Sequence, residues 1–355
     1  MDTADGSTAS TTTTTGVEAT LDGSVGRIAL DRPRSLNALT LPMVEQLEQV
    51  LLAWADEPLR AITIASTSER AFCAGGDIRQ VRQNTLDGQS AASRQFFATE
   101  YRVNHLLAAS AAPVVAFVDG VCMGGGLGLS VHGAFRVVGD AAVLAMPETS
   151  IGFFPDVGAT HFLPRLPGEI GTFLGLTGAR ASAADALGVG LATHHVASAD
   201  LGALAERLVA DDSPVEQVLA EAATPAGEST LVARRAEIDR TFDADSVDAI
   251  LAALQAEGTA WADETIGALE SASRQSLDLT LDLLRRGADL SLRACLDLEL
   301  RAAAGVTQTP DFVEGVRAVL VDKDRTPHWG ASRFRGITAE GDVEWTAGNG
   351  RSPAP

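Results

Sequence analysis

The pattern of apolar and polar positions changes along the chain. Apolar and polar residues alternate in Val17–Leu21 and again in Arg27–Leu30, and the turn-forming Asp22-Gly23-Ser24 lies between the two runs. Two alternating runs joined by such a turn predict a β hairpin. From Thr40 to Ala55 the apolar positions recur at helical spacing instead, which predicts a helix with Thr40 as its N-cap.

Short apolar runs and helical patterns continue to follow one another up to about residue 165. The expected strands are Arg60–Ala65, Pro113–Val118, Phe135–Val138 and Ala142–Leu144, and the expected helices are Ser93–Ala109 and Gly125–Gly133. Short strands that alternate with helices are typical of the α/β class. We therefore predict an α/β fold with a loose recurrence of strand, strand and helix.

Strand patterns fade after Gly168. The expected helices are Gly168–Leu176, Ser182–Leu187, Asp200–Leu208, Pro214–Ala222, Ser246–Glu257, Trp261–Ser271, Ser276–Arg286 and Leu290–Ala304. We predict an α/β core over residues 17–200 and an all-helical C-terminal region over residues 201–338. Residues 1–16 are rich in Ser, Thr and Ala and predict a disordered tail, and residues 339–355 predict a flexible one.

The formal net charge of −20 narrows the classes of partner. Such acidity opposes binding to a phosphate backbone or to an anionic membrane surface, and no stretch approaches the ~18 apolar residues of a membrane span. The first residues lack the features of a signal or transit peptide. Three widely spaced cysteines, Cys73, Cys122 and Cys295, indicate neither a disulfide framework nor a metal site. We predict a cytoplasmic protein without nucleic-acid or membrane partners.

Two glycine clusters, Gly75-Gly76 and Gly124-Gly125-Gly126, are the first candidates for chemistry. Each follows a strand-like run, and the second opens an expected helix. Glycine lets backbone amides approach a ligand closely, and two amides that converge on one carbonyl oxygen form an oxyanion hole. The alternative is that both clusters are tight turns. Neither fits a nucleotide P-loop or a Rossmann fingerprint.

Two carboxylates, Glu148 and Asp156, each follow a proline in an otherwise apolar segment. A carboxylate in such surroundings is either desolvated, with a raised pKa, or paired. Two of them in one Pro- and Gly-rich loop suit general acid–base or nucleophilic catalysis. The alternative for each is a helix cap or a buried salt bridge, for which Arg165 is the candidate partner.

Taken together, these segments resemble the enoyl-CoA hydratase/isomerase family, also called the crotonase family. The resemblance is carried by residues 30–39, 71–78, 119–128, 146–158 and 311–318. It implies a spiral of ββα repeats, an acyl-CoA substrate, no cofactor beyond that coenzyme A, and self-association as a homo-oligomer. It places the oxyanion hole at the amides of Gly76 and Gly125. It places the coenzyme A site at Arg34, Ser35, Leu36, Ala74, Gly75, Gly76, Asp77 and Ile78.

One position separates the chain from the hydratases of that family. Hydratases use two glutamates, and the first lies where this chain has Gly128, while Glu148 matches the second. The chain is most similar to the 3-hydroxyisobutyryl-CoA hydrolase branch, also at residues 96–101, 162–166 and 321–324. That likeness implies substrate-binding or catalytic roles for Glu100, Gly125, Glu148 and Asp156.

The expected reaction is therefore hydrolysis of a short 3-hydroxyacyl-CoA thioester. Within that class the resemblance favours 3-hydroxyisobutyryl-CoA, a substrate of valine catabolism. Glu148 and Asp156 are the expected catalytic residues, and Glu148 acts either as the nucleophile or as the base that activates water. Two alternatives stay open. One is an enoyl-CoA hydratase or isomerase that uses Glu148 alone, and the other is a non-catalytic acyl-CoA-binding protein.

Overall fold

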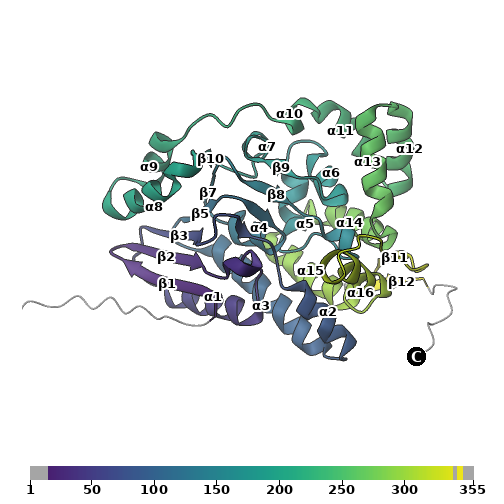
Figure 1. The fold of residues 1–355 in the computed structure, drawn as a ribbon, viewed down its shortest axis with the longest axis horizontal. Coiled ribbons are helices and arrows are strands. Elements are labelled where there is room, and N and C mark those ends of the chain that lie inside the picture. The colour runs from purple at the N-terminus through teal and green to yellow at the C-terminus, as the bar shows by residue number, and fades with distance from the viewer. Residues whose placement is uncertain (1–14, 339–341, 347–355) are drawn as a thin grey trace, which may run out of the picture.

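The computed structural model describes residues 15–338 and 342–346. Two β-sheets form the N-terminal half (Figure 1). The six-stranded sheet has the order β1-β2-β3-β5-β7-β10, and the four-stranded sheet has the order β4-β6-β8-β9. The strands are β1 Val17–Asp22, β2 Val25–Leu30, β3 Ala61–Ser66, β4 Ala71–Cys73, β5 Val114–Val118, β6 Val121–Met123, β7 Phe135–Val138, β8 Val143–Ala145, β9 Ala181–Ser182 and β10 His194–His195.

Each of the strand pairs β1–β2, β3–β4, β5–β6 and β7–β8 is followed by one or more helices. The helices of this half are α1 Leu41–Ala53, α2 Ile78–Leu86, α3 Ser90–Ala109, α4 Gly125–Ser130, α5 Ala159–Phe162, α6 Ile170–Thr177 and α7 Ala183–Val189. In three successive units the first strand (β3, β5, β7) joins the large sheet and the second (β4, β6, β8) joins the small one. This confirms the predicted α/β class, the hairpin of β1 and β2, and the strand–strand–helix recurrence.

The small sheet fixes where the candidate chemistry lies. Strands β4, β6 and β8 are parallel neighbours, with Ala71 opposite Val121 and Met123 opposite Ala145. Their carboxyl ends therefore meet at one edge, and the segments that follow them begin with Ala74, Gly124 and Met146. Both glycine clusters and Glu148 thus leave adjacent strands on the same side, as ligand-binding segments of parallel sheets usually do.

The C-terminal half is mainly helical and packs beside the sheets (Figure 1). Its helices are α8 Leu201–Ala210, α9 Val215–Ala222, α10 Thr230–Ala233, α11 Arg235–Phe242, α12 Val247–Glu257, α13 Ala260–Ser271, α14 Arg274–Gly287, α15 Leu292–Val306 and α16 Pro310–Val316, followed by a π-helix at Arg317–Val321. No helix in the described part of the chain is long and apolar enough to cross a membrane.

The end of the chain differs from the prediction in one respect. Strands β11 Phe334–Ile337 and β12 Val343–Trp345 pair as an antiparallel hairpin, where we expected helix and flexible tail. Phe334 and Trp345 pack edge to face across this pair, which gives the hairpin an apolar contact of its own. The predicted tail of residues 1–16 lies outside the described residues apart from Thr15 and Gly16, and so does most of residues 339–355.

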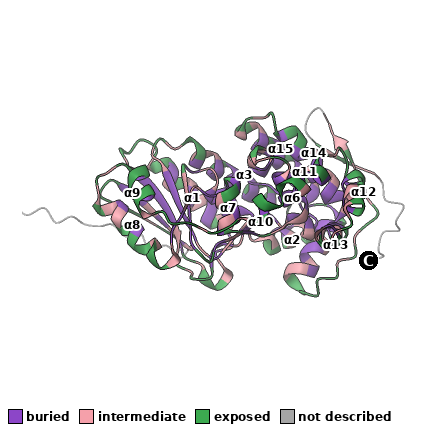
Figure 2. Ribbon diagram, turned by 90° about the horizontal axis from the view of Figure 1, so that it is seen from above, coloured by how far each residue is buried: buried purple, intermediate pink, exposed green. Residues whose placement is uncertain are grey.

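Buried residues run along the strands and the inner faces of the surrounding helices (Figure 2). One apolar cluster extends from the sheets through α1 and α3 to the C-terminal helices α14 and α15. A second, smaller cluster joins one face of the large sheet to α8 and α9, through Phe117, Leu204 and Leu219 among others. The shared larger cluster means that the C-terminal helices and the strand region bury apolar surface against each other.

Candidate active site

The two glycine clusters bring two backbone amides together. Gly75 and Gly124 have positive φ angles of 101° and 47°, which glycine tolerates and a β-carbon would strain. A β-carbon built on Gly125 would lie only 3.4 Å from the amide nitrogen of Gly76. Gly125 is the first residue of α4, so its N–H is one of the groups that a helix leaves unpaired at its start. The geometry thus suits one oxygen held between two N–H groups.

Glu148 lies directly beside this pair of amides. It follows Pro147 at the start of a 3-10 turn, Glu148–Ile151, and only 8% of its surface is exposed. A β-carbon on Gly124 would lie 2.7 Å from Oε1 of Glu148, so glycine leaves the room that the carboxyl group occupies. Burial, and next the charge of Asp156, raise the pKa of Glu148 well above its usual range. Its Oε2 has no hydrogen-bond partner among the described residues.

Asp156 and Glu100 complete a group of buried carboxyls. The hydroxyl of Tyr101 donates a 2.7 Å hydrogen bond to Oδ2 of Asp156. Burial raises the pKa of Asp156 to about 7, and the bond from Tyr101 opposes that shift. Burial, then the charges of Asp156 and Glu148, raise the pKa of Glu100. A carboxyl with a pKa near 7, as in Asp156, can exchange protons near neutral pH.

The salt bridge considered for these carboxyls is not formed with Arg165. The guanidinium of Arg165 donates instead to the carbonyl oxygens of His161, Gly287 and Leu290. Within the described residues no Lys or Arg pairs with Glu100, Glu148 or Asp156. Charge repulsion between the three is therefore relieved by protonation or by a bound ligand.

A strained turn presents Asp156 to the site. The next residue, Val157, has a φ of 54°, which is rare for a β-branched side chain and costs free energy. His132 donates from Nε2 to the carbonyl oxygen of Val157 over 2.7 Å. Burial lowers the pKa of His132 to about 4, so this ring stays neutral at physiological pH.

Glu299 holds the same turn from the other side. This residue of α15 is fully buried, and its carboxylate accepts the N–H of Gly158 at 2.7 Å and the N–H of Thr160 at 3.0 Å. The Thr160 hydroxyl donates to it as well, at 2.5 Å. Burial raises the pKa of Glu299 to about 8 against these hydrogen bonds. Sequence reasoning missed Glu299 because it lies 141 residues from Gly158.

The position of the missing hydratase carboxylate is filled by other residues. A β-carbon on Gly128 would lie 2.7 Å from Cβ of Val157 and 2.8 Å from Nδ2 of Asn104. Real side-chain carbons are not found at such distances, so a glutamate at 128 requires both neighbours to move. The loss of that carboxylate is therefore built into the packing of α3, α4 and the Asp156 turn.

The two segments predicted to bind coenzyme A are hydrogen-bonded to each other. The N–H of Ala74 donates to the carbonyl of Leu36 at 2.9 Å, and the N–H of Leu39 donates to that of Gly75 at 2.8 Å. Arg34 is exposed beside this junction, whereas Ser35, Leu36, Asp77 and Ile78 are half-buried. The structure therefore places all of these residues in one continuous region next to Gly76.

A cavity of about 510 Å³ opens next to this junction. Two of its walls, Leu39 and Phe96, also lie against the two amides: a β-carbon on Gly125 would be 3.0 Å from Leu39, and one on Gly76 would be 3.0 Å from Phe96. Arg32 lines the cavity too and pairs with Asp77 at 3.4 Å. An elongated substrate arm in this cavity would thus end at the candidate oxyanion hole.

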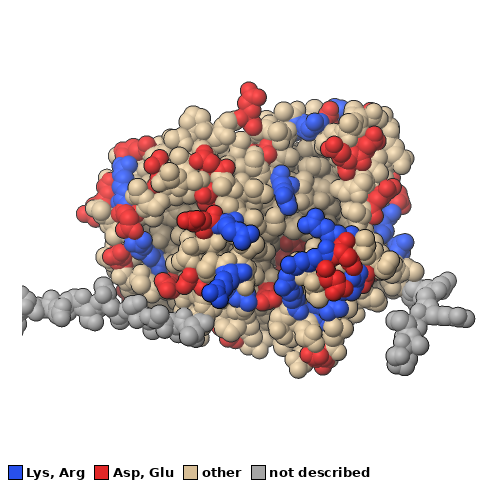
Figure 3. Space-filling model, viewed as in Figure 1, with Lys and Arg blue, Asp and Glu red and all other residues tan. Residues whose placement is uncertain are grey.

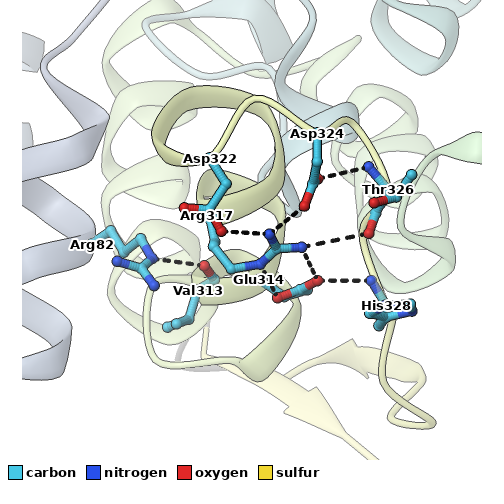
Figure 4. A network of polar contacts seen from close by, with 8 residues as sticks. All are labelled: Arg82, Val313, Glu314, Arg317, Asp322, Asp324, Thr326 and His328. Carbon is cyan, nitrogen blue, oxygen red and sulfur yellow. Dashed lines mark hydrogen bonds and ion pairs between the residues drawn. The ribbon is translucent and has the colours of Figure 1, made fainter.

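A network around Arg317 accounts for the motif at residues 321–324 (Figure 4). Arg317 pairs with Glu314, Asp322 and Asp324 at 2.8, 2.7 and 2.6 Å. Nε of Arg82 on α2 donates to the carbonyl of Val313, which ties α16 to the helix that begins at Ile78. The aspartates of this motif therefore hold the chain that follows α16. Lys and Arg side chains also gather over α2 and α16 on the face in Figure 3, in a chain of net charge −20.

Comparison with known proteins identifies the family of the chain. The profile of a family described as enoyl-CoA hydratase/isomerase matches residues 25–344. The chain belongs to the enoyl-CoA hydratase/isomerase family. Similar proteins with solved structures share the fold of this chain. The carnitinyl-CoA dehydratase from Mycobacterium thermoresistibile has a TM-score of 0.84 at 37% identity, and the match covers 88% of this chain and 91% of that one. An enoyl-CoA hydratase from Rhodobacter sphaeroides gives 0.83 at 39% identity, covering 92% and 93%.

Among curated members of the family, the chain is similar to 3-hydroxyisobutyryl-CoA hydrolases. It is 40% identical to the mitochondrial proteins so named from Gallus gallus and Homo sapiens, over 90% of this chain and 85% of each relative. It is also 40% identical to 3-hydroxyisobutyryl-CoA hydrolase 1 of Arabidopsis thaliana, over 88% of this chain and 86% of the relative. These matches and the fold confirm the predicted crotonase-like architecture and the predicted branch.

Proposed function

We propose that the protein hydrolyses the thioester bond of 3-hydroxyisobutyryl-CoA and releases 3-hydroxyisobutyrate and coenzyme A. One observation carries this proposal: Glu148 lies beside two convergent amides, while Val157 and Asn104 fill the space of the first hydratase carboxylate at Gly128. Addition of water across a double bond calls for both carboxylates. The names of the curated relatives support the same activity.

In the proposed reaction the thioester oxygen accepts hydrogen bonds from the N–H groups of Gly76 and Gly125. These bonds stabilise the negative charge that develops on that oxygen, a term worth ~3–4 kcal/mol per donor in comparable sites. The carboxylate of Glu148 attacks the carbonyl carbon, the C–S bond breaks, and the coenzyme A sulfur leaves with the electron pair and takes a proton. Water then hydrolyses the mixed anhydride and restores Glu148.

A second route uses the same residues. Glu148 takes a proton from water, and that water attacks the thioester carbon directly. In both routes Asp156 and Glu100 bind the 3-hydroxyl of the acyl group and supply or accept the remaining protons. The reaction needs no cofactor besides the coenzyme A of the substrate.

The biological setting belongs to the same proposal. Hydrolysis of this thioester is a step of valine degradation, and the proposed partner is the small-molecule acyl-CoA, without nucleic acid or membrane. The cytoplasmic location and self-association remain predictions, and the vertebrate relatives are named as mitochondrial proteins.

Two assays on one preparation test the proposal. The first follows release of free thiol from 3-hydroxyisobutyryl-CoA, and the second follows loss of the conjugated double bond of crotonyl-CoA. We expect rapid thiol release and no hydration. Hydration faster than thiol release would favour the hydratase alternative, since two similar solved structures are named as a dehydratase and a hydratase. No turnover with either substrate would favour an acyl-CoA-binding protein.

The variant Glu148→Gln links the activity to the site. It keeps the size of the side chain and removes both the nucleophile and the base. We expect thiol release to disappear while the Kd for the acyl-CoA stays within a few-fold of wild type. Turnover close to wild type in this variant would refute the role of Glu148.

A further inference from the structure

Asn104 is a buried amide without a partner. It lies on α3 with 0% of its surface exposed, and neither its Nδ2 nor its Oδ1 forms a hydrogen bond within the described residues. A buried amide in this state costs free energy, because it has lost its hydrogen bonds to water. Native proteins rarely keep such a group unless another molecule satisfies it.

Its position relates it to the candidate site. Asn104 follows Glu100 by four residues, so the two side chains lie on the same face of α3. The carboxyl of Glu100 lies against Gly125, and the amide of Asn104 lies 2.8 Å from the site of a β-carbon on Gly128. One face of α3 therefore runs along the first turn of α4, which begins at the candidate oxyanion amide.

Other buried polar atoms of the candidate site are also unpaired. Among the described residues, Oε1 of Glu100 and Oε2 of Glu148 lack hydrogen-bond partners, as both polar atoms of Asn104 do. Val157 touches the same point beside Gly128 and directly follows Asp156. A thioester oxygen at Gly125 would thus have its acyl carbons near Glu100, Asp156 and Asn104.

We propose that Asn104 determines specificity by binding the hydroxyl of the acyl group together with Asp156 and Glu100, a role that rests on the proposed function. A hydroxyl donates one hydrogen bond and accepts others, and the amide of asparagine offers one acceptor oxygen and a donor NH₂. An acyl group without the hydroxyl leaves this amide unpaired in a buried site and is rejected for that reason. Asn104 thus occupies the place of the hydratase carboxylate and serves recognition.

The test compares two substrates that differ only in that hydroxyl, 3-hydroxyisobutyryl-CoA and isobutyryl-CoA. Asn104→Leu keeps a similar volume and removes both polar atoms, and Asn104→Ser is a smaller second variant in case the first does not fold. We expect kcat/KM for the hydroxylated substrate to fall roughly 10- to 100-fold, and that for isobutyryl-CoA to change less than about 3-fold. Equal losses on both substrates, or no loss on either, would overturn the proposal.

Two further measurements test the role of Asn104 separately from the proposed hydrolase activity. Thr241→Val removes a buried hydroxyl from α11 and serves as a matched control in which the substrate ratio stays at the wild-type value. The Kd values of both acyl-CoAs, measured by calorimetry with Glu148→Gln alone and combined with Asn104→Leu, do not depend on turnover. Loss of preference for the hydroxylated acyl-CoA in the double variant supports the inference, and an unchanged preference overturns it. Wild-type thiol release alone decides the proposed function.

Discussion

The hydroxyl of Tyr101 donates a 2.7 Å hydrogen bond to Oδ2 of Asp156, and both side chains are buried. A hydrogen bond to a carboxylate favours its ionised form, whereas burial disfavours it. The two effects leave Asp156 with a pKa of about 7, close to the pH at which an acid–base group exchanges protons best. Tyr101, together with the backbone N–H of Asp156 itself, therefore keeps Asp156 partly ionised in this apolar region.

Removing that hydroxyl should shift the pH dependence of hydrolysis. In Tyr101→Phe the pKa of Asp156 rises, so a reaction that needs ionised Asp156 moves its acid limb upward by about one pH unit. The measurement is the pH profile of kcat for thiol release, with the melting temperature of the variant as a check on folding. An acid limb at the wild-type pH in a folded variant would show that Asp156 is not the group that titrates.

A β-carbon on Gly125 should block the site. It would overlap Oε1 of Glu100 and lie 3.0 Å from Leu39, beside the amide that we propose binds the thioester oxygen. We expect Gly125→Ala to lower kcat about 10²–10³-fold, the cost of losing one oxyanion donor. Gly202→Ala is the matched control, since Gly202 lies in α8 with no atom near its β-carbon position, and its kcat should equal that of wild type. Alanine keeps the backbone N–H, so full activity in Gly125→Ala would show that the site accommodates a β-carbon beside Glu100 and Leu39 without displacing that amide.

Glu299 should make stability depend on pH. Its pKa of about 8 in the folded protein lies above the ~4.3 of a glutamate in an unfolded chain. The folded state therefore binds the proton more tightly, and its contribution to stability is present below pH ~4.3 and is lost as pH rises towards 8. Glutamine does not titrate, so Glu299→Gln lacks this pH dependence of stability. Between pH ~4.3 and 8, the free energy of unfolding of wild type minus that of the variant should therefore fall by about 1.4 kcal/mol per pH unit.

Urea unfolding at three pH values between 5 and 8 measures that difference. Glu264→Gln, an exposed position on α13, serves as the control and should follow wild type at every pH. Parallel curves for wild type and Glu299→Gln would mean that Glu299 does not change its proton occupancy on unfolding.

The crowding at Gly128 should be measurable as a loss of stability. Gly128→Ala places a carbon 2.7 Å from Val157 and 2.8 Å from Asn104, and overpacking of this kind costs ~1–3 kcal/mol. In Gly267→Ala, on α13, the new β-carbon has no neighbour within 4 Å. The free energy of unfolding of this variant should equal or exceed that of wild type, because alanine favours helices. Equal stability of the two variants would mean that α4 accommodates a side chain at position 128.

Local sequence patterns predicted much of this molecule. The glycine clusters and Glu148 could be placed because each follows a strand of the small sheet directly, and the order of strands brings the three together. The partners from distant elements could not be placed. Glu299 contacts the Asp156 turn although it lies 141 residues further along the chain. The sequence pattern around Asn104 does not mark it as a functional residue, because it lies in a helix whose other buried positions are mostly apolar.

The C-terminal hairpin was missed for a related reason. Phe334–Ile337 has only four residues, and Gly336 interrupts the alternation of apolar and polar positions. The segment is therefore too short to indicate a strand. Its partner Val343–Trp345 has only three residues. The two strands also share the contact of Phe334 with Trp345, which a reading of each short segment alone does not reveal.

The packing around Gly128 also bears on how this activity can change over generations. A single codon change that restores a glutamate there meets Val157 and Asn104 before any benefit of a second carboxylate can be selected. Changes that make room at both 157 and 104 would have to come first, and a glycine at 157 would also relieve the strain of the positive φ there. The order of substitutions therefore matters in this chain, because a glutamate at 128 that precedes changes in its neighbours overpacks the contact of α3 with α4.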